Sequence, residues 1–416
     1  MKTFHTDIAV IGGGAAGLAA AIYAARESKC GITVIERNPR PGKKLISTGN
    51  GRCNLAHSPV DFNAFYGERQ LARSVFARTT PEDEFFSSLG VKLTCDKNGN
   101  VYPYSNTSSA VLDGLRLEVA KAGVNMLTEF KVIDIVPLME GFRIYPDDDT
   151  KPIICARRLI LAPGGKAAPD TGSDGLCFTL IKKLSIEVKK LSPALCPIKT
   201  TNTDTRAMKG LRINACCSAV LNNGKVLRSE TGELQFGEDR LSGICIFNLA
   251  SLASRHGSNL IISVDLAPDI PPDELLKFIV QTAKIRADLP IEDLLSGLLP
   301  KRCGVTITKP ITRHPMNAKI KNLTTDELES LVLAIKDWRF PVRYSEPWLN
   351  AQVTAGGVPA HELTAELCSK RHPHLYFAGE VIDINGDCGG YNLMWCWRSG
   401  ELAGKSAAGS LMSVDN

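Results

Sequence analysis

Long runs of one charge are absent from this chain of 416 residues. Its 49 basic and 44 acidic residues are spread along the sequence, and the net charge is only +5. A basic stripe for nucleic acid is therefore not indicated, although the small excess suits an anionic cofactor or substrate. Internal repeats and low-complexity segments are absent as well, and the length predicts two or three ordinary domains.

Hydrophobic runs that could cross a membrane are also lacking. The one long stretch without charge, residues 8–25, contains three consecutive glycines and passes directly into Arg26 and Glu27. A buried strand followed by a sheet-packed helix explains this composition better than a signal or membrane segment does. We expect a soluble, cytoplasmic protein with no membrane partner.

Cysteine pairs at metal or redox spacing are missing. There are thirteen cysteines but no C-x-x-C, and their number is odd. This usage predicts reduced thiols and no metal site. Cys53 and Cys388 lie inside glycine-rich motifs, where we expect small side chains in tight loops rather than thiol chemistry.

The first motif that is present is DIAVIGGGAAGLAAAIYAA, which begins at Asp7. Gly12, Gly14 and Gly17 have G-x-G-x-x-G spacing after a short apolar strand. They suit a tight turn, a closely approaching pyrophosphate and close helix–strand packing. The next strand, residues 32–35, ends at Glu36, where a carboxylate can accept hydrogen bonds from ribose hydroxyls. Strand, turn, helix, strand and acid together predict a dinucleotide site.

The rest of the chain predicts an α/β fold with an insertion. Residues 1–191 and 345–416 are expected to form a Rossmann-like, three-layer FAD domain. Residues 192–344 form the insertion, with a β-barrel-like part at 192–267 and a largely helical part at 268–344. Helices are expected at 81–89, 108–122, 273–287, 291–299, 326–336 and 393–408. Strands are expected at 124–130, 159–162, 218–221, 226–227, 261–265 and 375–378, with a small meander at 131–157.

Three further loops combine glycine with polar groups. GKKLISTGNGRCN, residues 42–54, places Lys43, Lys44 and Arg52 among three glycines, which suits an anion pressed against backbone. LILAPGGKAAPDTGSDG, residues 159–175, leaves a strand through small residues, although an ordinary strand-to-loop turn explains it equally well. AQVTAGGV, residues 351–358, is another loop made largely of small residues.

The most specific segment is LYFAGEVIDINGDCGGYNL, residues 375–393. Glu380 follows a strand and suits ribityl hydroxyls. Gly389 and Gly390 open the final helix, and its N-terminus would stabilise the anion that forms at the flavin N1/O2 when N5 accepts hydride.

Together with GELQFGEDRLSG at residues 232–243, these motifs resemble the BaiN/RdsA family, the YhiN-like flavoproteins, over nearly the whole chain and in the same order. The resemblance implies noncovalent FAD in a domain interrupted by a barrel and a helical subdomain. The residues expected to contact FAD are Gly12, Gly14, Ala15, Ala16, Gly17, Glu36, Arg37, Lys43, Lys44, Gly51, Arg52, Cys53, Val132, Ala162, Pro163, Gly164, Gly379, Glu380, Asp383, Gly390, Tyr391, Asn392 and Leu393.

The sequence departs from its relatives in three places. Ala162-Pro163-Gly164 stands where related flavoproteins often have Ala-Thr-Gly. Gln352-Val353-Thr354 stands where the fumarate reductases carry a substrate-binding histidine, which argues against succinate or fumarate chemistry. Gly237-Glu238-Asp239-Arg240 replaces a run with threonine and histidine, so the family's substrates cannot simply be transferred.

Three functions are open. The first, which the resemblance implies, is hydride transfer through FAD N5 to a conjugated enone of a steroid or bile-acid-like molecule. NAD(P)H would visit transiently, since no second G-x-G-x-x-G follows a strand. The second, also implied by the resemblance, is oxidation of a small amine or aminoketone by oxygen. The third is a redox-sensing or RNA-associated flavoprotein, for which Lys301, Arg302, Lys319 and Lys321 are the basic candidates.

Catalytic residues are less defined by the sequence. Arg52, Tyr391, Gln352 and Thr354 lie in the loops expected to face the isoalloxazine, and Tyr102 is a candidate proton donor. Each of these residues is expected to position the substrate or flavin rather than to donate the proton. The oligomeric state is not indicated by any of these patterns.

Overall fold

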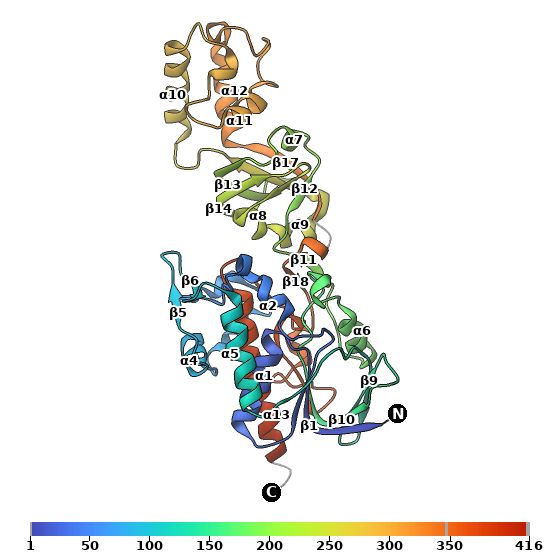
Figure 1. The fold of residues 1–416 in the computed structure, drawn as a ribbon. Helices are drawn as coiled ribbons and strands as arrows, with labels where there is room; N and C mark the ends of the chain where they lie inside the picture. The colour runs from blue at the N-terminus through green and yellow to red at the C-terminus, as the bar shows by residue number, and fades with distance from the viewer. Residues whose placement is uncertain (1, 346–347, 413–416) are drawn as a thin grey trace. The chain divides into compact units, whose positions relative to one another are not determined.

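The computed structural model describes residues 2–345 and 348–412 (Figure 1). The chain forms two compact units. Unit 1 comprises Met1–Pro193 and Ala351–Asn416, and unit 2 comprises Ala194–Asn350. Unit 1 is therefore built from both ends of the chain, with unit 2 inserted between them.

Unit 1 is organised around one sheet in the order β7-β2-β1-β10-β9-β8, with β19 paired to β10. The strands are β1 (Thr3–Ile11), β2 (Ile32–Ile35), β7 (Asn125–Leu127), β8 (Val132–Leu138), β9 (Gly141–Pro146), β10 (Ile153–Leu161) and β19 (Leu375–Phe377). Five of them, β7, β2, β1, β10 and β19, pair in parallel. The sequence predicted a meander at 131–157 and a separate strand at 159–162. In the structure, one strand, β10, forms the end of the meander and also the predicted strand, since it pairs antiparallel to β9 and parallel to β1.

The register of the parallel strands brings remote segments to one edge of this sheet. Ile11 lies opposite both Ile35 and Leu161, and Leu161 lies opposite Phe377. The carboxyl ends of four strands therefore coincide, which is where open α/β sheets bind ligands.

The two chain ends are joined by the packing of α1 (Ala15–Glu27) against α13 (Tyr391–Met412), with α5 (Ser108–Lys121) beside α1 (Figure 1). A Cβ atom on Gly400 would lie 2.6 Å from the Ala16 carbonyl oxygen, and one on Gly404 would lie 2.2 Å from that of Ala20. Glycine on one helix and alanine on the other thus allow the backbones to touch. This packing fixes the first helix against the last.

Unit 1 is completed by short elements around this core. They are α2 (Lys43–Ser47), β3 (Ala56–His57), β4 (Phe65–Gly67), α3 (Arg69–Phe76), α4 (Glu82–Ser88), β5 (Leu93–Cys95), β6 (Asn100–Pro103), α6 (Leu176–Lys183), β11 (Ser192–Ala194), β18 (Val353–Ala355) and β20 (Ile384–Gly386). The expected helices at 81–89 and 108–122 correspond to α4 and α5.

Unit 2 contains a closed barrel of six strands in the order β12-β15-β14-β13-β16-β17. They are β12 (Ile198–Thr200), β13 (Arg212–Leu221), β14 (Val226–Phe236), β15 (Arg240–Ser242), β16 (Leu260–Asp265) and β17 (Trp338–Ser345). Small helices α7 (Asp204–Ala207), α8 (Ile244–Phe247) and α9 (Ala250–His256) accompany it. Three helices form the rest: α10 (Pro272–Ile285), α11 (Lys301–Thr308) and α12 (Thr325–Lys336).

One expectation for unit 2 was wrong, and another holds with a strand at its end. The segment 268–344 is largely helical as expected, but its last residues belong to β17, which closes the barrel between β16 and β12. Its buried Trp338, Phe340 and Val342 alternate with exposed residues, and this period of two was the missed signal. The helix expected at 291–299 is only a short 3-10 turn at Ile291–Asp293 followed by turns. Gly297 weakens a helix there, and Pro300 instead precedes α11.

Other expectations are confirmed. Helix α12 begins with the predicted capping box, in which the Thr324 hydroxyl accepts from Glu327 N and the Glu327 carboxylate accepts from Thr324 N. The thirteen cysteines are all thiols. None of the helices in the described ranges has the length and apolar character that a membrane crossing requires.

Candidate functional site

The glycine turn after β1 sits at the shared edge of the sheet. Gly12 has φ +107°, and a Cβ there would lie 2.2 Å from the Ala162 carbonyl oxygen. A Cβ on Gly17 would lie 1.8 Å from the Gly12 carbonyl oxygen, whereas one on Gly14 would meet no atom within 4 Å. Gly12 and Gly17 are therefore required by the fold itself, and Gly14 leaves open space at the N-terminus of α1. That space, with the helix N–H groups of Ala15 and Ala16 beside it, suits a diphosphate.

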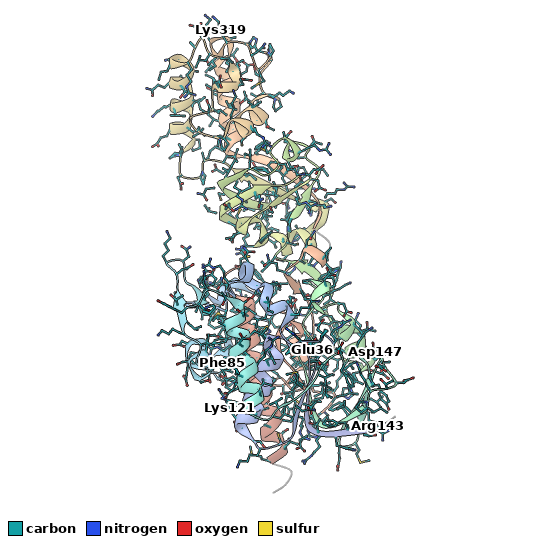
Figure 2. The ribbon with its side chains drawn as sticks, in the orientation of Figure 1. Glu36, Phe85, Lys121, Arg143, Asp147 and Lys319 are labelled. Atoms are coloured by element: carbon teal, nitrogen blue, oxygen red, sulfur yellow. The ribbon has the colours of Figure 1, made fainter. Side chains whose placement is uncertain are left out.

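Glu36, labelled in Figure 2, directly follows β2 at the same edge. It is 7 % exposed. Its Oε2 accepts from the Gly13 N–H at 2.8 Å, and its Oε1 accepts from the backbone and side-chain amides of Asn38, both at 2.7 Å. Arg37 instead pairs with Asp174 at 2.6 Å. The carboxylate is thus held firmly beside the glycine turn. Asn38, which fixes it, was not identified from the sequence.

A chain of polar contacts joins three remote loops, and we call it the Lys44–Glu380–Thr354 chain. Lys44 Nζ lies 2.8 Å from Glu380 Oε2, and Glu380 Oε1 accepts from Thr354 N at 2.8 Å. The Thr354 hydroxyl oxygen accepts from the backbone N–H groups of Lys166 at 2.8 Å and Ala167 at 3.1 Å. Lys44 and Glu380, both expected at the cofactor, are therefore brought together although they are 336 positions apart.

The loop after β10 leaves the edge through Ala162, Pro163 and Gly164. Gly164 has φ +79°, and a Cβ on Gly165 would lie 2.2 Å from Thr354 Oγ1 and 2.5 Å from Glu380 Oε1. Ser173, in the same loop, is buried, and its hydroxyl has no hydrogen-bond partner within the residues that the structure describes. An unsatisfied buried hydroxyl is costly unless a further group pairs with it. Sequence reasoning did not single out Ser173.

The turn before α13 also depends on glycine. Gly389 and Gly390 have φ of +121° and +92°, and a Cβ on Gly390 would lie 2.4 Å from the Ala56 carbonyl oxygen. The Asn392 side chain accepts from Gly386 N and donates to its carbonyl oxygen, at 2.8 and 2.9 Å. These contacts hold the first turn of α13 in place, and Leu393 beside Asn392 is half-buried.

Tyr391 is packed rather than open. It is 5 % exposed, with its ring 4.9 Å from His57 in a stacked arrangement and 5.4 Å from Phe65 in an edge arrangement. Burial raises the pKa of its hydroxyl. His57 Nδ1 is buried and has no partner in the described part of the chain. A role for His57 was not expected from the sequence.

Arg52 and Tyr102 form a second polar pair. The Arg52 guanidinium carbon lies 4.2 Å from the Tyr102 ring centroid, and Arg52 Nε donates to Asn106 Oδ1 at 2.7 Å. Arg52 is exposed and Tyr102 is half-buried. Partial burial raises the pKa of Tyr102, against the opposing effect of the Arg52 charge. Tyr102 therefore keeps its proton at neutral pH.

The other residues that the sequence predicted for the cofactor or the reaction differ in how far they are buried. Lys43 and Gln352 are exposed, and Gly51 is half-buried. Val132 opens β8 and is buried, as is Asp383, which lies 3.0 Å from Lys189 Nζ. Gly379 follows β19, and its N–H donates to Ser399. Cys53 is fully buried, and burial raises the pKa of its thiol to about 11, which disfavours thiolate chemistry.

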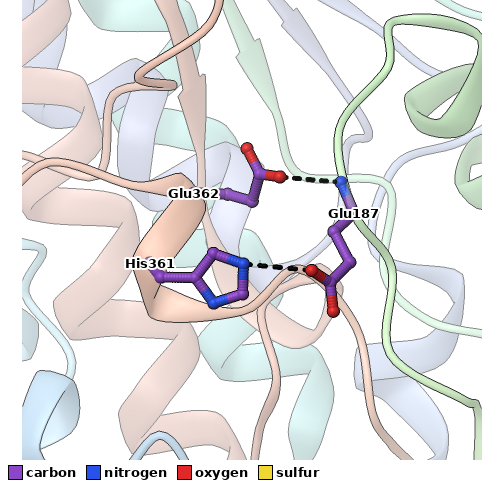
Figure 3. Close-up of side chains that lie close together, drawn as sticks. All are labelled: Glu187, His361 and Glu362. Atoms are coloured by element: carbon purple, nitrogen blue, oxygen red, sulfur yellow. Dashed lines mark hydrogen bonds and ion pairs between the residues drawn. The ribbon is translucent and has the colours of Figure 1, made fainter.

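Three potential metal ligands meet elsewhere in unit 1, at Glu187, His361 and Glu362 (Figure 3). His361 Nε2 lies 3.0 Å from Glu187 Oε2, and the Glu187 N–H donates to Glu362 Oε1 at 3.2 Å. Arg371 also bonds Glu362 at 2.9 Å and lowers the pKa of that carboxyl. Arg371 already neutralises Glu362, so we describe these residues as a clamp that joins two loops through hydrogen bonds and the Arg371–Glu362 ion pair. The sequence had predicted no metal, and His361 is exposed as expected.

Features from both chain ends thus fit FAD. Open space lies over Gly14, a carboxylate ends β2, an ion pair of Lys44 and Glu380 lies at the sheet edge, and Ser173 offers an unpaired hydroxyl. A family model described as "HI0933-like protein Rossmann domain" matches residues 6–406. The chain belongs to this HI0933-like family. It is an oxidoreductase with a Rossmann-like FAD domain.

Relatives cover nearly the whole chain. The 3-dehydro-bile acid delta(4,6)-reductase of Clostridium scindens is 32 % identical over 409 residues, covering 96 % of this chain and 98 % of that protein. The ribosomal RNA dihydrouridine synthase of Escherichia coli is 26 % identical over 400 residues, covering 94 % of this chain and 96 % of that protein.

Solved structures share the fold. A mutant form of the Escherichia coli quinol fumarate reductase FrdA has a TM-score of 0.54 at 17 % identity, covering 100 % of this chain and 72 % of that chain. The 3-ketosteroid delta1-dehydrogenase of Sterolibacterium denitrificans has a TM-score of 0.51 at 12 % identity, covering 98 % of this chain and 100 % of that chain. At such identities the likeness concerns the fold alone.

Proposed function

We propose that this HI0933-like protein is an NAD(P)H-dependent, FAD-containing reductase of a carbon–carbon double bond conjugated to a carbonyl, in a steroid-like substrate. The observation that carries the proposal is the 32 % identity to a bile-acid delta(4,6)-reductase over 96 % of the chain. The glycine turn, Glu36 and the Lys44–Glu380 pair support it, because they supply what a bound dinucleotide needs.

The names of both relatives describe reduction of a carbon–carbon double bond. A 3-oxo steroid with a delta-4 double bond is an enone, and the C5–C6 double bond of uridine is also conjugated to a carbonyl. Reduction adds a hydride to the carbon remote from the carbonyl and a proton to the adjacent carbon. Once reduced by NAD(P)H, bound FAD would supply that hydride from N5, so that one NAD(P)H and one proton are consumed per double bond.

The chain's own residues would divide the work. Gly14 and the start of α1 would receive the diphosphate, Glu36 the adenosine ribose, and Glu380 with Lys44 the ribityl chain. The N–H groups at the start of α13, fixed by Asn392, would stabilise negative charge at the pyrimidine end of the flavin. Arg37, Val132 and Asp383 remain proposed contacts of the cofactor.

Among the catalytic candidates, we favour Tyr102 as the proton donor and Arg52 as its electrostatic partner. Tyr102 is partly accessible and stays protonated at neutral pH. Tyr391 is 5 % exposed and packed between His57 and Phe65, and Thr354 is 1 % exposed with its hydroxyl accepting two N–H groups. We therefore assign both residues positioning roles. Gln352 is exposed and remains a candidate for contact with substrate.

The reductant and the compartment follow from simpler features. A second glycine fingerprint is absent from the sequence, so NAD(P)H would reach the flavin transiently rather than occupy a domain of its own. Thirteen thiols favour a reducing compartment, and we propose the cytoplasm.

Uridine in RNA is the second candidate substrate, because two relatives are named ribosomal RNA dihydrouridine synthases. Three of the four basic residues that the sequence singled out for RNA in the helical part already form ion pairs. Lys319, labelled in Figure 2, and Lys321 share Asp288, and Lys301 lies 2.9 Å from both Glu292 and Asp293. Residues 268–337 contain equal numbers of acidic and basic side chains. These pairs favour the steroid-like substrate over RNA.

The proposal is tested by product analysis under anaerobic conditions. The FAD-loaded protein is incubated with NADH or NADPH and with a 4-ene-3-oxo steroid, a uridine-containing ribosomal RNA fragment or an amine. Mass spectrometry is expected to find the steroid with two added hydrogens. Reduction of uridine in the RNA fragment, with no reduction of the steroid, would show that RNA is the substrate. Peroxide formed from the amine in air, with no reduced steroid, would establish an oxidase instead.

A further inference from the structure

Two segments lie where the chain leaves unit 1 for unit 2 and where it returns. We call residues 189–194 the first crossing and residues 351–357 the second crossing. They are joined by the two-stranded sheet of β11 and β18. Both are short, and each is fastened to unit 1 by specific contacts.

The first crossing is fastened by charge and by close backbone packing. Lys189 Nζ lies 2.6 Å from Glu68 Oε1 and 3.0 Å from Asp383 Oδ2, and its N–H donates to the Gly357 carbonyl oxygen at 2.9 Å. A Cβ on Gly356 would lie 2.3 Å from the Lys190 carbonyl oxygen. The clamp of Glu187 and His361 in Figure 3 holds the residues just before this crossing. The first crossing is therefore bonded to the second at Gly357 and packed against it at Gly356.

The second crossing is fastened by Thr354. Its N–H donates to Glu380, whose other carboxylate oxygen pairs with Lys44, and its hydroxyl accepts two backbone N–H groups of the loop after β10. Thr354 is 1 % exposed, so these bonds have no competition from water. The strand that carries the crossing thus shares Glu380 directly with the cofactor-holding pair.

We propose that Thr354 is a positioning residue that couples FAD binding at Glu380 and Lys44 to the ordering of both crossings. The inference rests on the proposed placement of FAD at this pair. A ligand that fixes the Glu380 carboxylate fixes its bond to the Thr354 N–H. The Thr354 hydroxyl holds that N–H in place by accepting from the loop after β10, and the β11–β18 pairing carries the order to the first crossing. Such coupling is reciprocal: loosening the crossings must weaken FAD by the same factor.

The test uses the full chain and two measurements, the dissociation constant of FAD and amide hydrogen exchange with and without FAD. In the wild type, FAD is expected to slow exchange in peptides covering residues 189–194 and 351–357. Thr354→Val removes the hydroxyl acceptor at nearly constant volume. It is expected to weaken FAD on the order of 10-fold and to reduce this protection. Thr354→Ser restores the acceptor and should recover both.

Thr308→Val is the matched control. Thr308 is also a buried threonine, 3 % exposed, but it lies in α11 of unit 2, and its hydroxyl donates to Gly304 within its own helix. It should leave FAD affinity and the protection of the crossings unchanged.

The outcomes separate this inference from the proposed function. A wild type that binds FAD without slower exchange in the crossings would overturn the coupling alone. Wild-type affinity and protection in Thr354→Val would overturn it too, because the hydroxyl would then be dispensable. A wild type that binds no FAD would overturn the coupling and the proposed function together.

Discussion

The two units use polar side chains in different ways. In unit 1, Glu36 is 7 % exposed and Glu401 1 % exposed, and both are bonded to distant segments. In unit 2, the ion pairs of Lys301, Lys319 and Lys321 in the helical part are at the surface. Buried, bonded polar groups can hold a charged ligand in a fixed place, whereas solvated pairs contribute little beyond solubility.

Topology explains this difference. The parallel strands of unit 1 place Leu161 opposite Phe377, so groups that are far apart in the chain meet at one edge. The barrel of unit 2 is antiparallel, and its longest pairing joins the neighbours β13 and β14. A site assembled from remote loops is therefore to be expected in unit 1.

The largest difference in stability between variants of the two units is expected where a buried ion pair of unit 1 is broken. Arg398 bonds Glu82 through both carboxylate oxygens, at 2.7 and 3.0 Å, and both side chains are under 10 % exposed. Arg398→Ala would leave Glu82 buried without its partner and should cost about 3–5 kcal/mol of unfolding free energy. Lys319→Ala, at an exposed pair, should leave the calorimetric melting profile unchanged. Equal effects of the two variants would abolish the contrast between the units.

The glycine turn offers a sharper test within unit 1. Gly17→Ala places a Cβ 1.8 Å from a backbone oxygen, so it should destabilise unit 1 by about 1–3 kcal/mol and lose FAD. Gly14→Ala meets open space and should keep the melting temperature while weakening FAD. Melting scans and FAD titrations compare them. Unchanged FAD affinity in Gly14→Ala would show that no diphosphate approaches this position.

The ion pair of Lys44 and Glu380 should affect the dissociation constant of FAD more than the free energy of unfolding. Lys44→Met removes the charged partner that orients Glu380. It should weaken FAD by about 10-fold, because a displaced Glu380 would lose a charged hydrogen bond to the ribityl chain, which contributes about 1.5–3 kcal/mol. Lys43→Met, at the exposed neighbour, is the matched control and should bind FAD normally. Fluorescence titration measures both, and equal losses would point to general charge rather than to the pair.

The smallest effect is expected at the clamp, and it depends on pH. Arg371 holds the folded-state pKa of Glu362 below its ordinary value. The carboxylate therefore stabilises the fold above the ordinary glutamate pKa of about 4.3, and this stabilisation is lost as pH falls through the folded pKa. Glu362→Gln should melt lower than the wild type at pH 7, and the difference should shrink in acid. A difference that is constant with pH would exclude the charge as its origin.

The sequence predicted most of unit 1 and less of unit 2. The turn at Gly12, the strand ending at Glu36 and the glycines before α13 have strong local signals, because backbone geometry demands those residues. Strand β17 was missed because Pro341 interrupts an otherwise alternating segment that follows a helix. Ser173 and Asn38 were missed because single polar residues in loops carry no pattern of their own. Thr354 was identified, but its contacts with Glu380 and the loop after β10 are set by tertiary structure.

Anaerobic mixing of the FAD-loaded protein with NADH or NADPH, followed at the flavin absorbance band, tests the central claim most directly. The account predicts that one nucleotide bleaches the band and that a 4-ene-3-oxo steroid then restores it, while the saturated 3-oxo steroid does not. No bleaching with either nucleotide would contradict an NAD(P)H-dependent reductase, and bleaching that the enone cannot reverse would contradict the proposed substrate class.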